Sequence, residues 1–314
     1  MRQNSLDFRR APTSRARSAR APSLVAGLAL GLACQARTAD QSVRHAARAE
    51  ASGSAPLRAG ESSALGVRQS TPGEATPGSV PERASTRCPA EMAFVERPQG
   101  SFCIDRWEAS LERRTAGRRE LWPGNRTIDG LEADLFAVSV AGRKPQGYVS
   151  ADQAARACAN AGKRLCELDE WTRACRGAAD TRYPYGDERR PDVCNDRFAL
   201  LEAHPVVRLF ESSTQPGTPR STMWQPAFLN DPRLHELPRT VEPTGARSAC
   251  TNELSVYDLV GNLHEWIADP EGTFVGGFFM DTFQNGEGCD YRTTAHPRDY
   301  HDYSTGFRCC RDAE

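Results

Sequence analysis

The sequence lacks several features that would point directly to a class of function. Its 314 residues carry a net charge of −1, so no global field favours nucleic acid or an anionic membrane as a partner. It has no internal repeat, no heptad pattern and no glycine-rich loop of the phosphate-binding type. The apolar run Leu24–Ala33 is too short to remain in a bilayer as a spanning helix. What remains is a chain long enough for one or two domains with a sizeable core.

Cysteine is present in number, but without the spacing of a common metal site. The 11 cysteines include no Cys-x-x-Cys pair. The spacing of Cys158, Cys166 and Cys175 fits no common zinc module, so a zinc-thiolate site is the weaker alternative. Apart from Cys34 the number of cysteines is even, which in an exported protein predicts a disulfide framework.

Two cross-links follow from position along the chain. Cys88 and Cys103 flank a predicted hairpin and can pair across it. Cys194 and Cys250 bracket residues 197–245, a stretch with several prolines and little periodic pattern. A bridge between them would restrict the unfolded chain and stabilise the domain by something on the order of 3 kcal/mol.

The N-terminus has the composition of an export signal. Residues 1–22 carry six arginines against one aspartate, and the short apolar run ends at Cys34. Gly31-Leu32-Ala33-Cys34 resembles a bacterial lipoprotein processing site, although the usual pattern places leucine where Gly31 stands. We therefore expect residues 1–34 to be a signal peptide, with Cys34 as a lipid anchor if the site is of lipoprotein type. The protein would then be periplasmic, a cell-envelope lipoprotein or secreted.

A change of composition separates a linker from a domain. Residues 35–87 are rich in small and polar residues and hold almost no large apolar ones. Such a segment cannot bury enough surface to offset its ordering entropy, so we predict a disordered linker. Residues 88–314 form the predicted domain.

Local signals predict short elements of both kinds within this domain. Met92–Val95 and Ser101–Asp105 read as strands of a hairpin. A capping box starts a helix at Ser150 that runs to about Ala161, and a second helix is predicted over Leu168–Arg176. Trp171 lies on the apolar face of the second helix, so we predict a core position for it.

The run VYDLVGNLHEW, Val256–Trp266, is the best candidate for a cation site. Gly261 and Asn262 allow a tight turn with positive φ, which can point carbonyl oxygens inward. Asp258 and Glu265 add two carboxylates around that turn. Oxygen ligands of this kind suit a hard cation such as calcium. The competing interpretation is a surface turn with two solvated acids.

The order of the motifs resembles one protein family, the formylglycine-generating enzymes or sulfatase-modifying factors. The motifs that carry the resemblance occur in the family's order and span about residues 88–314: GSFCIDRWE (100–108), Ser150 followed by CANAGKRL (158–165), EW (170–171), CRG (175–177), YPYG (183–186), VYDLVGNLHEW (256–266), GG (276–277) and GFRCC (306–310). The resemblance implies an α+β domain, a loop-rich variant of the C-type-lectin fold stabilised by disulfides and calcium.

The resemblance also implies particular metal ligands. In the family, the segment that matches VYDLVGNLHEW binds calcium through side chains where Asp258 and Glu265 stand, and through backbone oxygens where Gly261 and Leu263 stand. A second calcium site in the family maps one ligand onto Asn195. Its other ligands fall in a stretch that cannot be aligned.

Three further disulfides are implied in the same way. The family joins its first-helix cysteine to the cysteine of the terminal GFRC motif. It joins its second-helix cysteine to a Tyr-Arg-Cys run, which here ends in Thr293, so that Cys289 would substitute as the partner. The remaining two cysteines would then pair with each other. These expected pairs are Cys158–Cys309, Cys175–Cys289 and Cys166–Cys310.

The oxidase site of the family is not reproduced in this sequence. Family oxidases bind copper with two nearby cysteines and convert a substrate cysteine to formylglycine, and thiolates suit Cu(I). The first of these cysteines corresponds to Asp281, and a family serine corresponds to Phe278. The second falls near Cys289, which is the local candidate for a catalytic residue. His264 stands where the family keeps a substrate-site tryptophan.

The sequence therefore favours an exported binding or scaffold module that has lost the copper-cysteine chemistry. Its partner would be a protein or a glycan, with no nucleic acid, and with a membrane only through Cys34. The alternative is an active formylglycine-generating oxidase with a rearranged site around Cys289, which would need copper.

Overall fold

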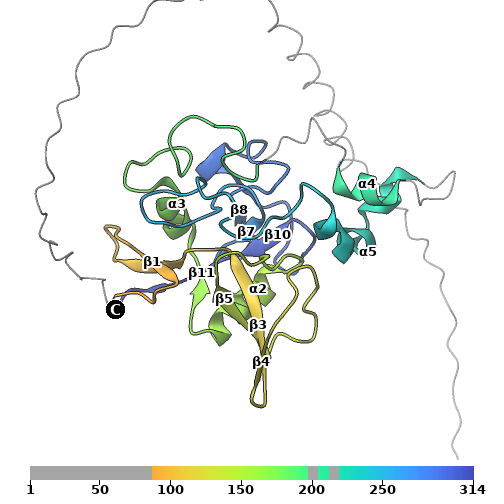
Figure 1. The fold of residues 1–314 in the computed structure, drawn as a ribbon, viewed down its shortest axis with the longest axis horizontal. Helices are drawn as coiled ribbons and strands as arrows, with labels where there is room; N and C mark the ends of the chain where they lie inside the picture. Colours follow the sequence, from red (N-terminus) through yellow and green to blue (C-terminus); the bar gives the residue numbers. More distant parts are fainter. Residues whose placement is uncertain (1–86, 197–203, 212–218) are drawn as a thin grey trace, which may run out of the picture. The chain divides into compact units, whose positions relative to one another are not determined.

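The structure, a computed structural model, describes residues 87–196, 204–211 and 219–314 (Figure 1). These residues form short strands and short helices. The strands are β1 (Met92–Val95), β2 (Phe102–Asp105), β3 (Ala109–Thr115), β4 (Arg118–Leu121), β5 (Leu135–Ser139), β6 (Arg164–Leu165), β7 (His264–Trp266), β8 (Phe274–Val275), β9 (Arg292–Thr293), β10 (Thr305–Phe307) and β11 (Cys309–Asp312). The helices are α2 (Ala151–Asn160), α3 (Leu168–Arg176), α4 (Pro205–Phe210), α5 (Pro226–Leu229) and the 3₁₀ turns η3 (Arg220–Trp224), η4 (Pro232–Glu236) and η5 (Gly288–Asp290). The predicted signal peptide, Cys34 and nearly all of the predicted linker lie outside the described residues.

Within the described residues the strands form three small sheets. Their orders are β1-β2-β11-β6, β10-β7-β8-β9 and β4-β3-β5. The mixture of helix and strand agrees with the α+β class predicted from the sequence. None of the described helices combines the length and the apolar character that crossing a bilayer requires.

The two predicted helices form where local signals place them. Ser150 caps α2 by accepting a hydrogen bond from the Gln153 N–H at 3.3 Å, and the Gln153 side chain accepts from the Ser150 N–H at 3.1 Å. This reciprocal capping box satisfies donors that the first helical turn leaves unpaired. Helix α3 has the predicted bounds, and Trp171 is buried on its inner face as predicted.

The stretch predicted to be irregular contains more helix than its sequence suggested. Where it is described, it holds the short helices α4, η3, α5 and η4. Prolines open α4, α5 and η4, where a missing N–H costs nothing and the fixed φ suits the first turn. The prediction was wrong here because helices of four to six residues are too short to show an apolar period.

Two motifs that are distant in the sequence lie side by side in the sheet β10-β7-β8-β9. Strand β10, from the GFRCC motif, runs parallel to β7, from the VYDLVGNLHEW motif. The register pairs Gly306 with Glu265 and Phe307 with Trp266. This pairing brings the residue after β10, Arg308, next to Glu265.

Strand β11 then joins two cores through adjacent cysteines. Neighbouring side chains on a strand point to opposite faces, so Cys309 and Cys310 face different layers. Cys309 is buried with α2 and bonds to Cys158, whereas Cys310 is buried with α3 and bonds to Cys166. One strand is thereby cross-linked on both faces.

The described part of the chain contains the disulfides that the sequence analysis expected. The pairs are Cys88–Cys103, Cys158–Cys309, Cys166–Cys310, Cys175–Cys289 and Cys194–Cys250. Disulfides in this number are typical of proteins that fold in an oxidising compartment.

Candidate functional site

The VYDLVGN turn, residues 256–262, contains three residues in left-handed backbone conformations. Asp258, Gly261 and Asn262 have φ values of 59°, 84° and 57°. A Cβ atom at Gly261 would lie 2.2 Å from the Asn195 carbonyl oxygen, so only glycine fits there. The Asn262 N–H donates to that same carbonyl oxygen at 2.9 Å. The turn is therefore fixed against the segment that carries Asn195.

Behind this turn lies a buried charge cluster, which consists of Glu108, Asp258, Glu265 and Arg308. Arg308 donates from Nη2 to Glu265 Oε1 at 2.6 Å and from Nε to Glu265 Oε2 at 2.7 Å. Glu108 accepts from the Asn262 side-chain amide at 2.5 Å and from the Leu263 N–H at 3.1 Å. Asp258 Oδ2 accepts from the Gly245 N–H at 2.6 Å. Each charged group therefore has a specific partner.

The cluster holds more acid than base, and its pKa shifts reflect this. Burial raises the pKa of Asp258 to about 7, although the Gly245 N–H and Arg308 both act to lower it. Burial, and then repulsion from Asp258 and Glu265, raises the pKa of Glu108 well above its usual range. Burial disfavours the charged form of Arg308, but attraction to Glu265 outweighs it and leaves the pKa of Arg308 raised. Three carboxyl groups thus share one guanidinium, and an added cation would relieve the excess negative charge.

The predicted calcium ligands can be tested against this geometry. Asp258, Gly261 and Leu263, which follows the VYDLVGN turn directly, are all buried and offer a carboxylate and carbonyl oxygens, which suit a hard cation. Glu265 is different, because both of its oxygens already accept hydrogen bonds from Arg308 and Oε2 also accepts from Trp171 Nε1 at 2.7 Å. No set of three acidic, histidine or cysteine side chains converges on one point in the described residues. A cation here would therefore depend on Asp258 and backbone oxygens.

Asn195 lies directly against this turn. Its side-chain nitrogen donates to the Thr240 carbonyl oxygen and to Asn262 Oδ1, both at 2.9 Å. Its Oδ1 is buried and has no hydrogen-bond partner. A buried acceptor without a donor is costly, so Oδ1 is suited to contact a cation or a water molecule. The sequence analysis expected Asn195 to belong to a second site, and in the structure Asn195 lies against the turn that carries the first candidate site.

Asp281, which the sequence analysis aligned with the first catalytic cysteine of the family, has a structural task. Asp281 is buried, and its Oδ1 accepts hydrogen bonds from the Phe283 and Gln284 N–H groups, both at 3.0 Å. Its Oδ2 accepts from the Tyr291 hydroxyl at 3.1 Å. Because its oxygens are used to close a turn and to hold Tyr291, Asp281 acts as a structural acceptor.

His264 belongs to the same neighbourhood. Its Nε2 lies 3.3 Å from the Tyr291 hydroxyl, and its Nδ1 lies 3.3 Å from Ser304 Oγ. The ring also packs against Phe278, with 4.7 Å between ring centroids. Burial lowers the pKa of His264 to about 3, so the imidazole is neutral at physiological pH. His264, Phe278 and Asp281 are therefore linked in one neighbourhood, His264 with Phe278 by ring packing and with Asp281 through the Tyr291 hydroxyl.

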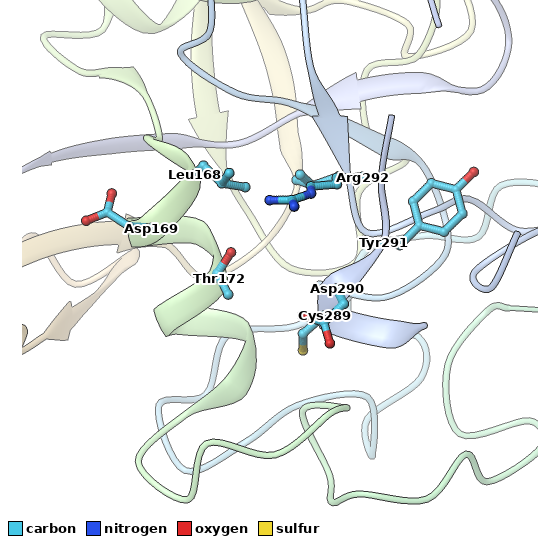
Figure 2. Close-up of a pocket in the computed structure, with 8 residues that line it drawn as sticks. Leu168, Asp169, Thr172, Cys289, Asp290, Tyr291 and Arg292 are labelled. Atoms are coloured by element: carbon cyan, nitrogen blue, oxygen red, sulfur yellow. The ribbon is translucent and has the colours of Figure 1, made fainter. Parts of the chain in front are cut away.

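Cys289, the local candidate for catalysis, has no free thiol in the structure because it is bonded to Cys175. This disulfide lies beside a pocket of about 550 Å³ between α3 and η5 (Figure 2). In Figure 2 the Arg292 side chain points toward α3, while the Tyr291 ring points away from it. The pocket is lined by charged and polar groups that include Asp169, Asp290 and Arg292. In its disulfide, Cys289 has no thiolate to offer for catalysis.

Sequence reasoning missed two members of the buried charge cluster. Arg308 sits between buried Phe307 and Cys309, and Glu108 precedes a buried strand. A charged residue inside an apolar or cross-linked run is itself a signal, because such a residue is rarely buried without a partner. Neither partner could be identified from the sequence, since each lies far away along the chain.

Comparisons with known proteins identify the family of this chain. The family described as "Sulfatase-modifying factor enzyme 1-like domain" matches residues 125–313. A curated relative from Bos taurus, "Inactive C-alpha-formylglycine-generating enzyme 2", is 27% identical over 180 residues, which cover 54% of this chain. The chain spans about half of that relative, since the match covers 50% of it. A solved structure titled "Crystal Structure of CarF" matches 68% of this chain and 87% of its own, with 18% identity and a TM-score of 0.36.

Proposed function

We propose that this chain, which belongs to the sulfatase-modifying factor enzyme 1-like family, is a disulfide-stabilised binding or scaffold module that does not oxidise cysteine. The observation that carries this proposal is the state of the residues at the family's oxidase position. Asp281 is committed to a turn, and Cys289 is committed to Cys175. In the described residues every cysteine is in a disulfide, so no pair of thiolates is left to bind Cu(I).

The comparison with the bovine relative adds support. That protein is named as inactive, and it matches a large part of the domain described above. The name of this relative indicates that a protein similar to this domain can lack the enzymatic activity. We infer the same for this chain: it keeps the domain and does not oxidise cysteine.

The absence of oxidation is directly testable. We expect no loss of mass on the cysteine of a Cys-x-Pro-x-Arg peptide after incubation with the full chain, copper and oxygen. We also expect peptide mapping of the unreduced protein to find Cys289 bonded to Cys175. The reason is that a disulfide sulfur is neither a nucleophile nor a metal ligand of the thiolate type.

An active family oxidase run under the same conditions is the positive control for the peptide assay. Conversion of the peptide by this chain would overturn the proposal and favour the alternative oxidase. A Cys289→Ser variant, with Cys175 also changed to serine, would then test whether the activity depends on that pair. A free thiol at Cys289 without peptide conversion would contradict only the disulfide assignment.

We also propose that the domain adopts the loop-rich variant of the C-type-lectin fold and binds calcium at the VYDLVGN turn. Asp258 and the carbonyl oxygens of Gly261 and Leu263 would hold the ion, with Glu265 nearby in its pair with Arg308. Support comes from the excess of buried acid and from the unpaired Asn195 Oδ1 beside the turn. The ion would supply charge neutralisation and would fix the turn.

Calcium should raise the thermal stability of the protein, and a chelator that removes calcium should lower it again. At a calcium concentration of 100 times Kd, mass action predicts about 2.7 kcal/mol of stabilisation. We expect Asp258→Ala to remove this dependence and to lower the bound calcium, measured on folded protein by mass spectrometry of the metal. The control is Asp299→Ala, because Asp299 is exposed and distant in sequence from the turn. The site is wrong if Asp258→Ala and Glu265→Ala both leave metal content and thermal stability unchanged.

The proposed compartment is the periplasm, the cell envelope or the exterior of the cell. Its support is the disulfide framework together with the export-like composition of residues 1–34. If Cys34 is lipidated, a Cys34→Ser variant should leave the membrane fraction. A variant that stays with membranes would count against that anchor.

A further inference from the structure

A second pocket, of about 420 Å³, has Tyr257 of the VYDLVGN turn in its wall. Its lining includes the aromatic residues Trp107 and Tyr257, together with Gly142, Thr244, Gly245 and Ser248. Among the described residues that line it, none is charged. The pocket near the Cys175–Cys289 disulfide is lined by aspartates and an arginine, so the two pockets suit different ligands.

The two aromatic rings form a stacked pair in the wall of the pocket. Trp107 and Tyr257 have nearly parallel planes, 8° apart, with ring centroids separated by 6.1 Å. Both side chains are half-buried, so part of each remains accessible. A stacked pair offers an apolar wall whose rigidity keeps the entropy cost of binding low.

Each ring also carries a polar group that is free to bind a ligand. Trp107 Nε1–H and the Tyr257 hydroxyl make no hydrogen bond to any described residue. Neither atom is buried, so both are accessible to a ligand. By contrast, the indole N–H groups of Trp171 and Trp266 donate to Glu265 and to the Val149 carbonyl oxygen. Donors of this kind beside an apolar face are what fixes the orientation of a small polar ligand.

The walls of the pocket are held in place before any ligand arrives. The Tyr257 N–H donates to the Arg106 carbonyl oxygen at 2.7 Å, and the Trp107 N–H donates to Ser139 Oγ at 3.1 Å. Gly245 has a φ of 73°, and a Cβ atom there would lie 3.2 Å from Trp107 Nε1. Glycine thus keeps the indole edge open, and the preformed walls reduce the cost of binding.

From these features we infer that the Trp107–Tyr257 pocket binds a neutral saccharide. A pyranose ring has an apolar face of C–H groups, which packs on aromatic rings, and a rim of hydroxyls, which both donate and accept hydrogen bonds. A charged ligand would lose solvation here without gaining an ion pair. A proline-rich peptide also stacks on aromatic rings, and its carbonyl oxygens can accept hydrogen bonds from the same donors, but its prolines offer no donor in return, so decaproline is the competing ligand in the test.

The test is a titration of the full chain with maltohexaose, cellohexaose and chitohexaose, followed by calorimetry and tryptophan fluorescence. We expect at least one of these neutral hexasaccharides to bind and Trp107→Ala to weaken its binding by about tenfold or more. Trp107→Phe, which keeps a ring and removes the N–H, covers the case in which Trp107→Ala fails to fold, and should weaken binding less. Trp224→Ala is the matched control, because Trp224 is 46% exposed and lies outside the pocket.

Three outcomes would overturn the inference: no binding of any neutral hexasaccharide, binding that Trp107→Ala and Trp107→Phe leave unchanged, or binding only of decaproline or a heparin hexasaccharide. The inference rests on the proposed binding function, but the two fail separately. Absence of sugar binding leaves the disulfide map and the peptide assay untouched. Oxidation of the peptide would remove the proposed function whatever the sugars do.

Discussion

Replacing Arg308 with methionine should destabilise the domain by about 3–5 kcal/mol, because the change leaves buried carboxylates without their cation. Arg308 is 1% exposed and makes two hydrogen bonds to Glu265, so water cannot replace it. Its Nη1 and Nη2 also donate to the Asp105 and Tyr257 carbonyl oxygens, at 3.0 and 2.8 Å. The free energy of unfolding in urea is the measurement.

Two further variants separate charge from packing. Arg311→Met removes a partly exposed arginine that pairs with the exposed Glu314, and we expect a change within about 0.5 kcal/mol. The double variant Arg308→Met with Glu265→Gln should recover part of the loss, since it removes one of the unpaired carboxylates. Equal stabilities of Arg308→Met and Arg311→Met would show that the buried charge cluster does not hold the domain together. A double variant no more stable than Arg308→Met would assign the loss to packing.

The second large effect concerns the disulfides at β11. Changing Cys158, Cys309, Cys166 and Cys310 to serine removes both bridges at β11 and should cost about 6 kcal/mol in the chain-entropy account. The two bridges must be removed together, because each closes nearly the same loop and either one alone keeps the chain cross-linked there. Changing Cys88 and Cys103, which are separated by 15 residues, should cost about 3 kcal/mol. Thermal and urea unfolding of the two serine variants measure the difference.

Loss of native packing must be distinguished from this effect. The pairs Cys158–Cys309 and Cys88–Cys103 have similar Cα–Cα distances, 5.8 and 5.7 Å, so their geometry alone gives no reason for unequal costs. Valine replacements at the same cysteines keep apolar bulk in the core and should preserve the order of the two costs. A larger cost for the short loop would contradict the chain-entropy account for this protein.

Much of the domain's local structure was predictable because its signals are local. The capping box at Ser150 and Gln153 needs only four consecutive residues, and it forms as predicted. The disulfide pairs were reached from loop positions and from the order of motifs shared with a family. The short helices between 204 and 236 were missed because a helix of four to six residues is too short for an apolar period to repeat.

The candidate site was only partly predictable from the sequence. Asp258 and Glu265 were identified as acids around a turn, and the structure does bury both. Their surroundings were not predictable, because Glu265 has its cation in Arg308 and Asp258 has its donor in the Gly245 N–H. A carboxylate that looks available in the sequence can already be paired in the fold.

The sequence by itself determined the family and the two main helices, since each depends on residue identity or on neighbours within a few positions. Tertiary structure alone decided which groups meet. The parallel pairing of β10 with β7 puts Arg308 against Glu265, and the hydrogen bond from the Tyr257 N–H to Arg106 sets Tyr257 beside Trp107. These contacts join segments that are far apart in the chain. They are fixed by strand register and by burial, and no local sequence pattern encodes either of these.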